Sequence, residues 1–365
     1  MNDGNSRVMG SEYMQWAKTN LRARYSLASS GLMNYPLADL PVSIEDLEIS
    51  GPSYYGYGPL QEALAVKSDV SPECVVAATG TSGANHLVMA LLIETGDEVL
   101  IEHPAYDPLI CTAQYLGARV KRFKRRAGSA FAVDPEEVAA QVSTGTRLIV
   151  LTNLHNPTCA YVDEETLIEL GKIARHVGAH VVVDEVYLDA IFENTPRSAF
   201  HLDPSVFIAT NSLTKVYGLS GLRCGWILAN PELAVRLWRL NDLFGVIPAH
   251  AAERLSVVAL KNLDKIATRS RRILEANREL LNSFFRSREC LDWTDQEFGT
   301  VSFPRLKQGN VDALASLLIE RYETSIVPGR FFEMPDHFRI GIGGDPTMFQ
   351  NGLERLGKSL DEISK

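Results

Sequence analysis

The chain lacks the features that define several classes of protein. No Cys-x-x-Cys pair occurs, and the five cysteines are widely spaced: Cys74, Cys111, Cys159, Cys224 and Cys290. An odd number at these spacings argues against a disulfide framework and a zinc site, so no metal is expected and a reducing cytoplasm is favoured. No apolar run reaches membrane-spanning length, and residues 1–10 contain no apolar core of a secretion signal, so we expect no membrane partner.

A surplus of basic residues is also missing. The net charge is −9 and the pI is about 5.5, which argues against a nucleic-acid surface. The one basic run, residues 121–126, is interpreted as a solvated strand end and loop without a function. What is present is 45% hydrophobic and 22% charged residues over 365 positions, a composition and length typical of a globular protein of two domains.

Apolar segments of strand length alternate with helical patterns in the first half of the chain. We predict strands at residues 75–78, 98–101, 118–123, 147–151, 179–183 and 206–209, helices at residues 86–94, 105–115 and 163–176, and the start of a further helix at Pro135. This alternation is typical of an α/β fold with a mostly parallel sheet covered by helices. Ligands of such sheets bind beyond the carboxyl ends of the strands.

The periodicity becomes helical after residue 231 and ends in short strand patterns and a last helix at residues 346–360. We therefore predict a large domain at residues 45–250 and a smaller α+β domain formed by residues 251–365 together with residues 1–44.

Residues 211–226 contain the most informative run, with Lys215 among small and hydroxylated neighbours. A desolvated lysine amine with a lowered pKa can form a Schiff base with a carbonyl group. Ser212 and Arg223 lie on either side of Lys215 in sequence and could hold an anion, since arginine offers a planar fork of donors that matches phosphate. The alternative is an ordinary exposed lysine after a strand.

The pattern Ser-x-x-Lys followed by Gly-Leu-x-Gly-x-Arg-x-Gly resembles the lysine motif of the fold-type I pyridoxal-phosphate (PLP) enzymes, specifically the class I and II aminotransferases. The resemblance extends from about Tyr54 to Gly341. It implies a three-layer α/β/α large domain, a Schiff base between Lys215 and PLP, and a homodimer with active sites at the subunit interface.

The resemblance also assigns cofactor contacts. A glycine-rich turn at residues 80–85, between a predicted strand and helix, would cradle the phosphate on free helix amides, and a simple turn is the alternative. Its residues are Thr81, Ser82, Gly83 and Ala84. Tyr106 would stack on the pyridine ring, or else be a packed core tyrosine. Tyr54 is a candidate for the tyrosine that reaches the phosphate of the neighbouring subunit, with Tyr55 and Tyr57 as substitutes.

Two further motifs complete the predicted cofactor site. The run Asn-Leu-His-Asn-Pro-Thr at residues 153–158 places Asn156 as a donor to the cofactor's phenolic oxygen, although Cys159 replaces the family's usual glycine. Asp184 follows a hydrophobic strand, and the resemblance gives it the protonated ring nitrogen as its partner. Tyr187 would bond the phenolic oxygen. Glu185 points to the opposite face of the strand and does not pair with Asp184.

Substrate contacts are predicted at Arg339, Asn156 and Gly31. Arg339 lies in an apolar strand and would grip the α-carboxylate of an amino acid with two hydrogen bonds; an internal ion pair is the alternative. In the resembled family, backbone near Gly31 approaches the same carboxylate, and a plain loop is the alternative reading of Ser29, Ser30 and Gly31.

The predicted reaction is transamination between an L-amino acid and a 2-oxo acid, with Lys215 as the general base, Asp184 stabilising negative charge at Cα and Tyr187 assisting. A fold does not fix a reaction, so a β-lyase, a racemase or an amino-acid-cyclising synthase on the same site remains open. A ligand-sensing module is disfavoured because few residues precede the first motif. A nicotinamide dehydrogenase is disfavoured because the full glycine fingerprint is missing.

Overall fold

The computed structural model describes residues 8–20, 23–52 and 54–363, and its largest element is a seven-stranded sheet. The strand order is β2-β8-β7-β6-β5-β3-β4, and β8 alone runs antiparallel to its neighbours in this sheet. The strands are β2 (Val75–Thr79), β3 (Glu98–His103), β4 (Arg119–Lys124), β5 (Thr146–Thr152), β6 (His180–Asp184), β7 (Phe207–Ser212) and β8 (Cys224–Leu228). The prediction of a mostly parallel sheet is confirmed.

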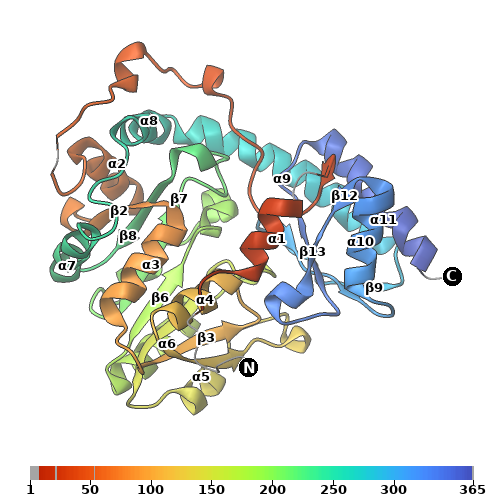
Figure 1. Cartoon of the computed structure of the whole chain (residues 1–365), viewed down its shortest axis with the longest axis horizontal. Coiled ribbons are helices and arrows are strands. Elements are labelled where there is room, and N and C mark those ends of the chain that lie inside the picture. Colours follow the sequence, from red (N-terminus) through yellow and green to blue (C-terminus); the bar gives the residue numbers. More distant parts are fainter. Residues whose placement is uncertain (1–7, 21–22, 53, 364–365) are drawn as a thin grey trace.

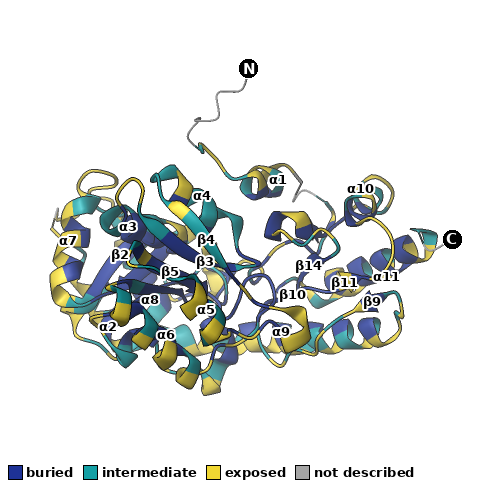
Figure 2. Cartoon of the chain, turned by 90° about the horizontal axis from the view of Figure 1, so that it is seen from below, coloured by how far each residue is buried: buried dark blue, intermediate teal, exposed yellow. Residues whose placement is uncertain are grey.

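Helices cover both faces of this sheet, which gives the three layers of the predicted fold (Figure 1). Helices α3 (Gly80–Leu92) and α4 (Asp107–Tyr115) lie on one face, and α5 (Pro135–Gln141) and α6 (Glu164–Val177) lie on the other (Figure 2). Central strands such as β6 read as continuous apolar runs because both of their faces are buried. Packing is close enough that a Cβ on Gly171 of α6 would come within 2.8 Å of the Phe207 ring.

Three further α-helices contact the large sheet: α2 (Gly58–Ser68), α7 (Pro231–Asn241) and α8 (His250–Lys261). The C-terminal part forms separate small sheets, ordered β10-β14-β13 and β9-β11, flanked by α9 (Leu263–Arg286), α10 (Val311–Tyr322) and α11 (Pro346–Ile363). Its strands are β9 (Leu291–Asp292), β10 (Val301–Ser302), β11 (Arg305–Leu306), β12 (Thr324–Ser325), β13 (Val327–Pro328) and β14 (Phe338–Gly341).

The N-terminal segment lies against this C-terminal part, because β1 (Tyr25–Ser26) pairs in parallel with β12. Helix α1 (Glu12–Asn20) lies between the large sheet's helix α4 and the C-terminal strands (Figure 1). The division into residues 45–250 and residues 1–44 with 251–365 stays a prediction.

Two local predictions were wrong. Residues 80–85 were expected to form a turn before a helix starting at residue 86, but α3 already begins at Gly80, whose φ of +69° makes the sharp change of direction in a single residue. The basic run at residues 121–126 is not entirely solvated, because Arg125 is buried and paired with Glu102. Within the described residues, none of the helices is both long and apolar enough to span a bilayer.

Candidate active site

The predicted site residues come together at the carboxyl edge of the large sheet. Strands β2, β6 and β7 run parallel and end at Thr79, Asp184 and Ser212, so the segments that follow them meet at one edge. Lys215 lies three residues beyond Ser212. The residues for which a cofactor or substrate role was predicted, with Tyr54 as the exception, lie at or next to this edge.

One end of the site is suited to an anion. The hydroxyl of Thr81 donates to the Ser212 hydroxyl at 2.9 Å, and Arg223 extends its guanidinium toward the start of α3. A Cβ on Gly80 would lie 2.3 Å from Arg223 Nη2, so the helix start and the guanidinium approach this closely only because residue 80 is a glycine. The N-cap residue Thr79 makes no side-chain hydrogen bond to the first turn, which contains Ser82, Gly83 and the buried Ala84.

Lys215 is partly buried, and its Nζ donates to the Ser30 hydroxyl at 3.1 Å. Loss of hydration, reinforced by the charge of Arg339, lowers the pKa of the Lys215 amine to about 8, against the opposing attraction of Asp184. Gly31 lies beside this lysine, since its Cβ would be 3.3 Å from Lys215 Cα. The Leu32 amide donates to the Lys215 carbonyl at 2.8 Å. An amine with this pKa is partly neutral near neutral pH and able to act as a nucleophile or base.

Asp184 is buried at the end of β6 and is held by neutral donors. Asn85 Nδ2 donates to its Oδ2 at 2.8 Å, and the Val186 amide donates to Oδ1 at 3.1 Å. The Thr210 hydroxyl donates to Asn85 Oδ1 at 2.6 Å, which fixes the amide with its NH₂ toward the carboxylate. Burial raises the pKa of Asp184 to about 6, although the Asn85 and Val186 hydrogen bonds oppose this rise. A cationic partner would satisfy this carboxylate.

Arg339 is fully buried in β14, at the opposite side of the site. Its Nη1 donates to Asn156 Oδ1 at 2.9 Å, and its Nη2 donates to the Tyr13 hydroxyl at 2.7 Å and to the Ala28 carbonyl at 3.3 Å. Within residues 8–20, 23–52 and 54–363, no carboxylate forms an ion pair with Arg339, and its Nε has no hydrogen-bond partner. The described residues therefore do not form the internal ion pair that was the alternative explanation for Arg339.

Two tyrosines border the space between these charges. Tyr187 is buried, and the loss of hydration raises the pKa of its phenol, which is also hydrogen-bonded to the Ser30 side chain. Tyr106 precedes α4, packs edge-on against Tyr13 with ring centroids 5.7 Å apart, and donates its hydroxyl to the sulfur of Met14 at 3.4 Å.

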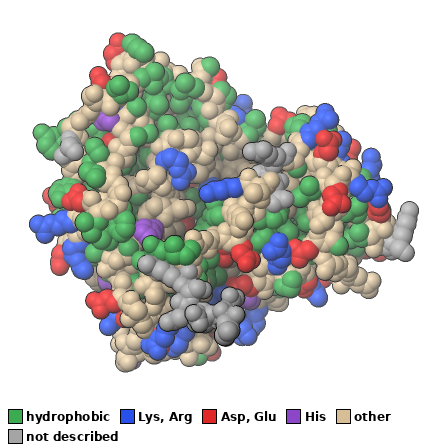
Figure 3. Space-filling view, in the orientation of Figure 1, with side chains coloured by type: hydrophobic (Ala, Val, Ile, Leu, Met, Phe, Trp, Pro, Cys, Tyr) green, Lys and Arg blue, Asp and Glu red, His purple; other side chains and the backbone are tan. Residues whose placement is uncertain are grey.

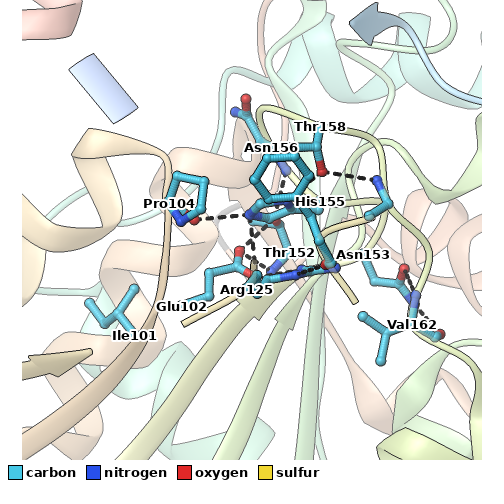
Figure 4. A network of polar contacts seen from close by, with 12 residues as sticks. Ile101, Glu102, Pro104, Arg125, Thr152, Asn153, His155, Asn156, Thr158 and Val162 are labelled. Carbon is cyan, nitrogen blue, oxygen red and sulfur yellow. Dashed lines mark hydrogen bonds and ion pairs between the residues drawn. The ribbon is translucent and has the colours of Figure 1, made fainter. Parts of the chain in front are cut away.

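A buried polar network lies behind Asn156 (Figure 4). Glu102 accepts from Arg125 Nη1 at 2.7 Å and from the Thr152 amide and hydroxyl at 2.8 and 2.7 Å. The Thr152 hydroxyl accepts from the Asn156 amide at 2.8 Å, so the ion pair determines where the Asn156 backbone lies.

His155 lies in the same network between the Thr158 hydroxyl and the Pro104 carbonyl, and its pKa is well below the usual range because burial disfavours its charge. Cys159, in the position where the family's turn has glycine, takes a φ of +57°, which is the left-handed region that glycine favours.

Tyr54 is not part of this assembly. Its side chain is exposed, in the segment before α2 that carries several other exposed apolar residues. Tyr55 bonds Asp242, and Tyr57 packs edge-on against His250. A role of Tyr54 at the site of a neighbouring subunit stays a prediction.

Comparison with known proteins decides the family. The family model described as aminotransferase class I and II matches residues 44–356. The chain belongs to this family. A curated relative, capreomycidine synthase from Streptomyces vinaceus, is 30% identical over 354 residues, covering 93% of this chain and 90% of the relative.

Solved structures agree on the fold. A PLP-dependent aminotransferase from Streptococcus suis superposes with a TM-score of 0.92 at 26% identity, covering 99% of this chain and 100% of that one. The PLP-dependent cyclase OrfR superposes with a TM-score of 0.89 at 24% identity, over the same shares of the two chains. PLP is the cofactor of this family and of these structural neighbours.

The residues present fit PLP. The anion-binding end formed by Thr81, Ser212, Arg223 and the start of α3 suits its phosphate, and the buried Asp184 lacks only a cationic partner such as the ring nitrogen. Lys215 lies near both, with a lowered pKa suited to binding an aldehyde.

Three residues of the site were missed by sequence reasoning. Ser30, Asn85 and Tyr13 bond Lys215, Asp184 and Arg339 respectively. Ser30 carried a weak signal, because it precedes Gly31 in a turn already discussed as substrate-proximal. Asn85 was assigned to the predicted turn, and Tyr13 to one side of a short amphipathic helix, and neither assignment indicates a contact with a buried charge.

Proposed function

We propose that this protein transfers the amino group of an L-amino acid to a 2-oxo acid with PLP as the cofactor. The observation that supports this best is the pair of buried opposite charges on either side of Lys215. Asp184 suits the ring nitrogen, and the unpaired Arg339 suits an α-carboxylate.

In this proposal each of the site residues has a defined role. Arg339 binds the α-carboxylate with two N–H groups, and Asn156 keeps the guanidinium in place. Lys215 Nζ takes the proton from Cα and returns it, which its pKa of about 8 allows near neutral pH. Thr81, Ser212 and Arg223 bind the phosphate, and Tyr106 and Tyr187 border the ring. Bound there, PLP supplies an electrophilic aldehyde and a ring that withdraws electrons from Cα.

Cyclisation of an amino acid is the second candidate. It shares the α-proton step and differs in keeping the nitrogen in the product. The capreomycidine synthase relative favours it, because that 30% identity extends over 93% of the chain. The aspartate aminotransferase of Pyrococcus horikoshii, at 23% identity over 302 residues, is more distant.

A homodimer is part of the proposal. The segment before α2 and the segment after α7 expose apolar side chains, and apolar side chains are seen along the upper edge and left side of the molecule in Figure 3. They include Ile44, Ile49, Tyr54 and Leu243, each 74% exposed or more. Contact between two copies would bury such residues and bring Tyr54 near the other copy's site. The five free cysteines fit a reducing compartment, and we propose the cytoplasm.

Two measurements test the function. Borohydride reduction of the PLP-loaded protein followed by peptide mapping should place the cofactor on Lys215, and the Lys215→Ala variant should show no label. Amino acids labelled with ¹⁵N, supplied with a 2-oxo acid, should then pass the label to the acceptor. Retention of all label in a product of changed mass would instead identify the cyclising synthase, and a label on another lysine would refute both candidates.

A further inference from the structure

Helix α1 places a phenol on the arginine that is proposed to bind substrate. Tyr13 is 7% exposed, and its hydroxyl accepts a hydrogen bond from Arg339 Nη2 at 2.7 Å. Its ring packs against Phe331 and Phe332 at centroid distances of 5.9 and 5.8 Å. The Tyr13 amide and the Ser11 hydroxyl donate to Asp107 at the start of α4, which fixes the helix above the site.

The donors of Arg339 can be counted. A guanidinium has five N–H groups. Nη2 donates both of its N–H groups, one to the Tyr13 hydroxyl and one to the Ala28 carbonyl. Nη1 donates one N–H group to Asn156, and its other N–H group has no acceptor among the described residues. The Nε–H is buried without a partner. A carboxylate bound by two parallel hydrogen bonds needs one N–H of Nη2 in either orientation, end-on with Nη1 or side-on with Nε.

A carboxylate therefore competes with one of the two acceptors on Nη2. The Ala28 carbonyl belongs to the backbone between β1 and Ser30. Tyr13, by contrast, is a side chain that can exchange one hydrogen-bond partner for another. The phenol is neutral, so it satisfies the geometry of the guanidinium without compensating its charge. An anion that forms two charge-assisted hydrogen bonds can replace it, whereas an anion that forms only one gains little over the phenol.

We propose that Tyr13 is a specificity-determining residue that occupies the carboxylate position on Arg339 in the free protein and yields it to an α-carboxylate. The proposal rests on the proposed function, in which Arg339 binds that carboxylate. It adds a selection step, because monodentate anions and amines without a carboxylate fail to displace the phenol.

The test compares a matched pair of probes on the PLP-loaded protein. 2-Methylalanine carries an amine and a carboxylate but no α-proton, so it binds without turnover. Isopropylamine has a hydrogen in place of the carboxylate, so its binding is read from the initial absorption change, before that α-hydrogen can be transferred. Binding of each is followed by the change in cofactor absorption, with the Tyr13→Phe variant, which loses the oxygen alone. The Trp16→Phe variant is the control, because Trp16 lies on the same helix and packs on Phe331 with ring centroids 5.4 Å apart.

Removing the competing acceptor should tighten 2-methylalanine binding by about tenfold, the lower range for a hydrogen bond to a charged group. Isopropylamine binding should stay unchanged, and Trp16→Phe should leave both unchanged. Acetate, titrated as a competitor, should gain affinity in Tyr13→Phe as well. Unchanged or weaker 2-methylalanine binding would overturn the proposal, the weaker result identifying Tyr13 as a ligand of the carboxylate.

The outcome for the unaltered protein separates the two proposals. If it binds 2-methylalanine no better than isopropylamine, Arg339 is not the carboxylate site, and the proposed function fails with the inference. If it prefers 2-methylalanine and Tyr13→Phe shows no gain, the function stands and the role of Tyr13 is refuted.

Discussion

The two buried charges of the site are held in different ways. Asp184 lies at the end of a central strand, and its partners, the Asn85 amide and the Val186 backbone, belong to the large sheet and its covering helix. Arg339 lies in a small sheet, and its partners come from two loops and from helix α1, with two N–H groups left over. The Asp184 carboxylate is held by neutral hydrogen-bond donors on rigid elements, whereas the Arg339 guanidinium keeps N–H groups without an acceptor in the described part of the chain.

The difference matches what each side is proposed to bind. A cofactor stays through every reaction cycle, so its partner can be fixed by a rigid, buried network. A substrate enters and leaves, so its partner needs contacts that can be exchanged. Rigid preorganisation around Asp184 and exchangeable contacts around Arg339 should therefore affect kcat and KM differently.

The largest effect is expected for Asp184→Ala. Loss of the carboxylate removes the group that is proposed to keep the ring nitrogen charged, so kcat should fall by about 10³-fold or more for any amino donor, in the range seen when an electrostatic stabiliser is removed. Steady-state kinetics with several donors measures this. Glu185→Gln is the control: Glu185 points to the other face and accepts from the Ala199 amide, so kcat should change little. Equal losses in both variants would show a general structural effect instead.

Glu102→Gln tests the support behind Asn156. The Glu102–Arg125 pair is fully buried, and removing one charge should cost about 3–5 kcal/mol of unfolding free energy. The control is Glu137→Gln, because Glu137 pairs with the exposed Arg126 in the same basic run, and loss of that pair should cost less than about 1 kcal/mol. Urea unfolding of both variants measures the difference, and similar costs would contradict the assignment of Glu102 as a buried anchor.

The Arg339→Lys variant tests the exchangeable contacts around Arg339. A lysine keeps the charge but loses the planar pair of donors, so kcat/KM for amino acids should fall by about 10–100-fold, chiefly through KM. Cofactor binding should stay within a few-fold of the unaltered protein. A fall in kcat as large as that of Asp184→Ala, with KM unchanged, would contradict the proposal that Asp184 acts on the cofactor and Arg339 binds the substrate.

Sequence reasoning could place the residues that follow strands, because strand ends meet at one edge of a parallel sheet. The family resemblance singled out Lys215, Asp184 and Asn156, and their positions after predicted strands placed them at this edge. Arg339 was singled out by its charge within an apolar strand and by the same resemblance. The role of Tyr13 could not be predicted, because Tyr13 contacts Arg339 across 326 positions. The sequence pattern indicates that Tyr13 lies on one side of a short amphipathic helix, but not what that side contacts.

Composition misled the prediction in two places, for physical reasons. The small residues of 80–85 are typical of a turn, yet close packing on β8 makes them the first turns of a helix. Arg125 lies in a basic run in which Lys124 and Arg126 are exposed, and only the tertiary structure places Glu102 where it can pair with Arg125.

The smallest effect is expected for Thr210→Val, and it depends on pH. In the cofactor-free protein, burial raises the pKa of Asp184 to about 6 from its ordinary value of 3.8. The folded state therefore holds this proton more tightly than the unfolded state. Stability from this group is complete below about pH 4 and is lost as the pH rises through about 6.

Valine cannot donate to Asn85 Oδ1, so the amide is held less firmly toward Asp184 and the carboxylate becomes harder to form. The pKa of Asp184 should then rise further, and more stability should be lost above pH 6. We expect Thr210→Val to cost about 1 kcal/mol at pH 5 and more at pH 8, as measured by denaturant unfolding of the cofactor-free protein. The buried Thr324, which donates to the Tyr322 carbonyl, provides the control: Thr324→Val should cost the same at both pH values. A cost of Thr210→Val that is independent of pH would mean that Asn85 keeps its orientation without the threonine, and that the rigidity of the Asp184 side has another source.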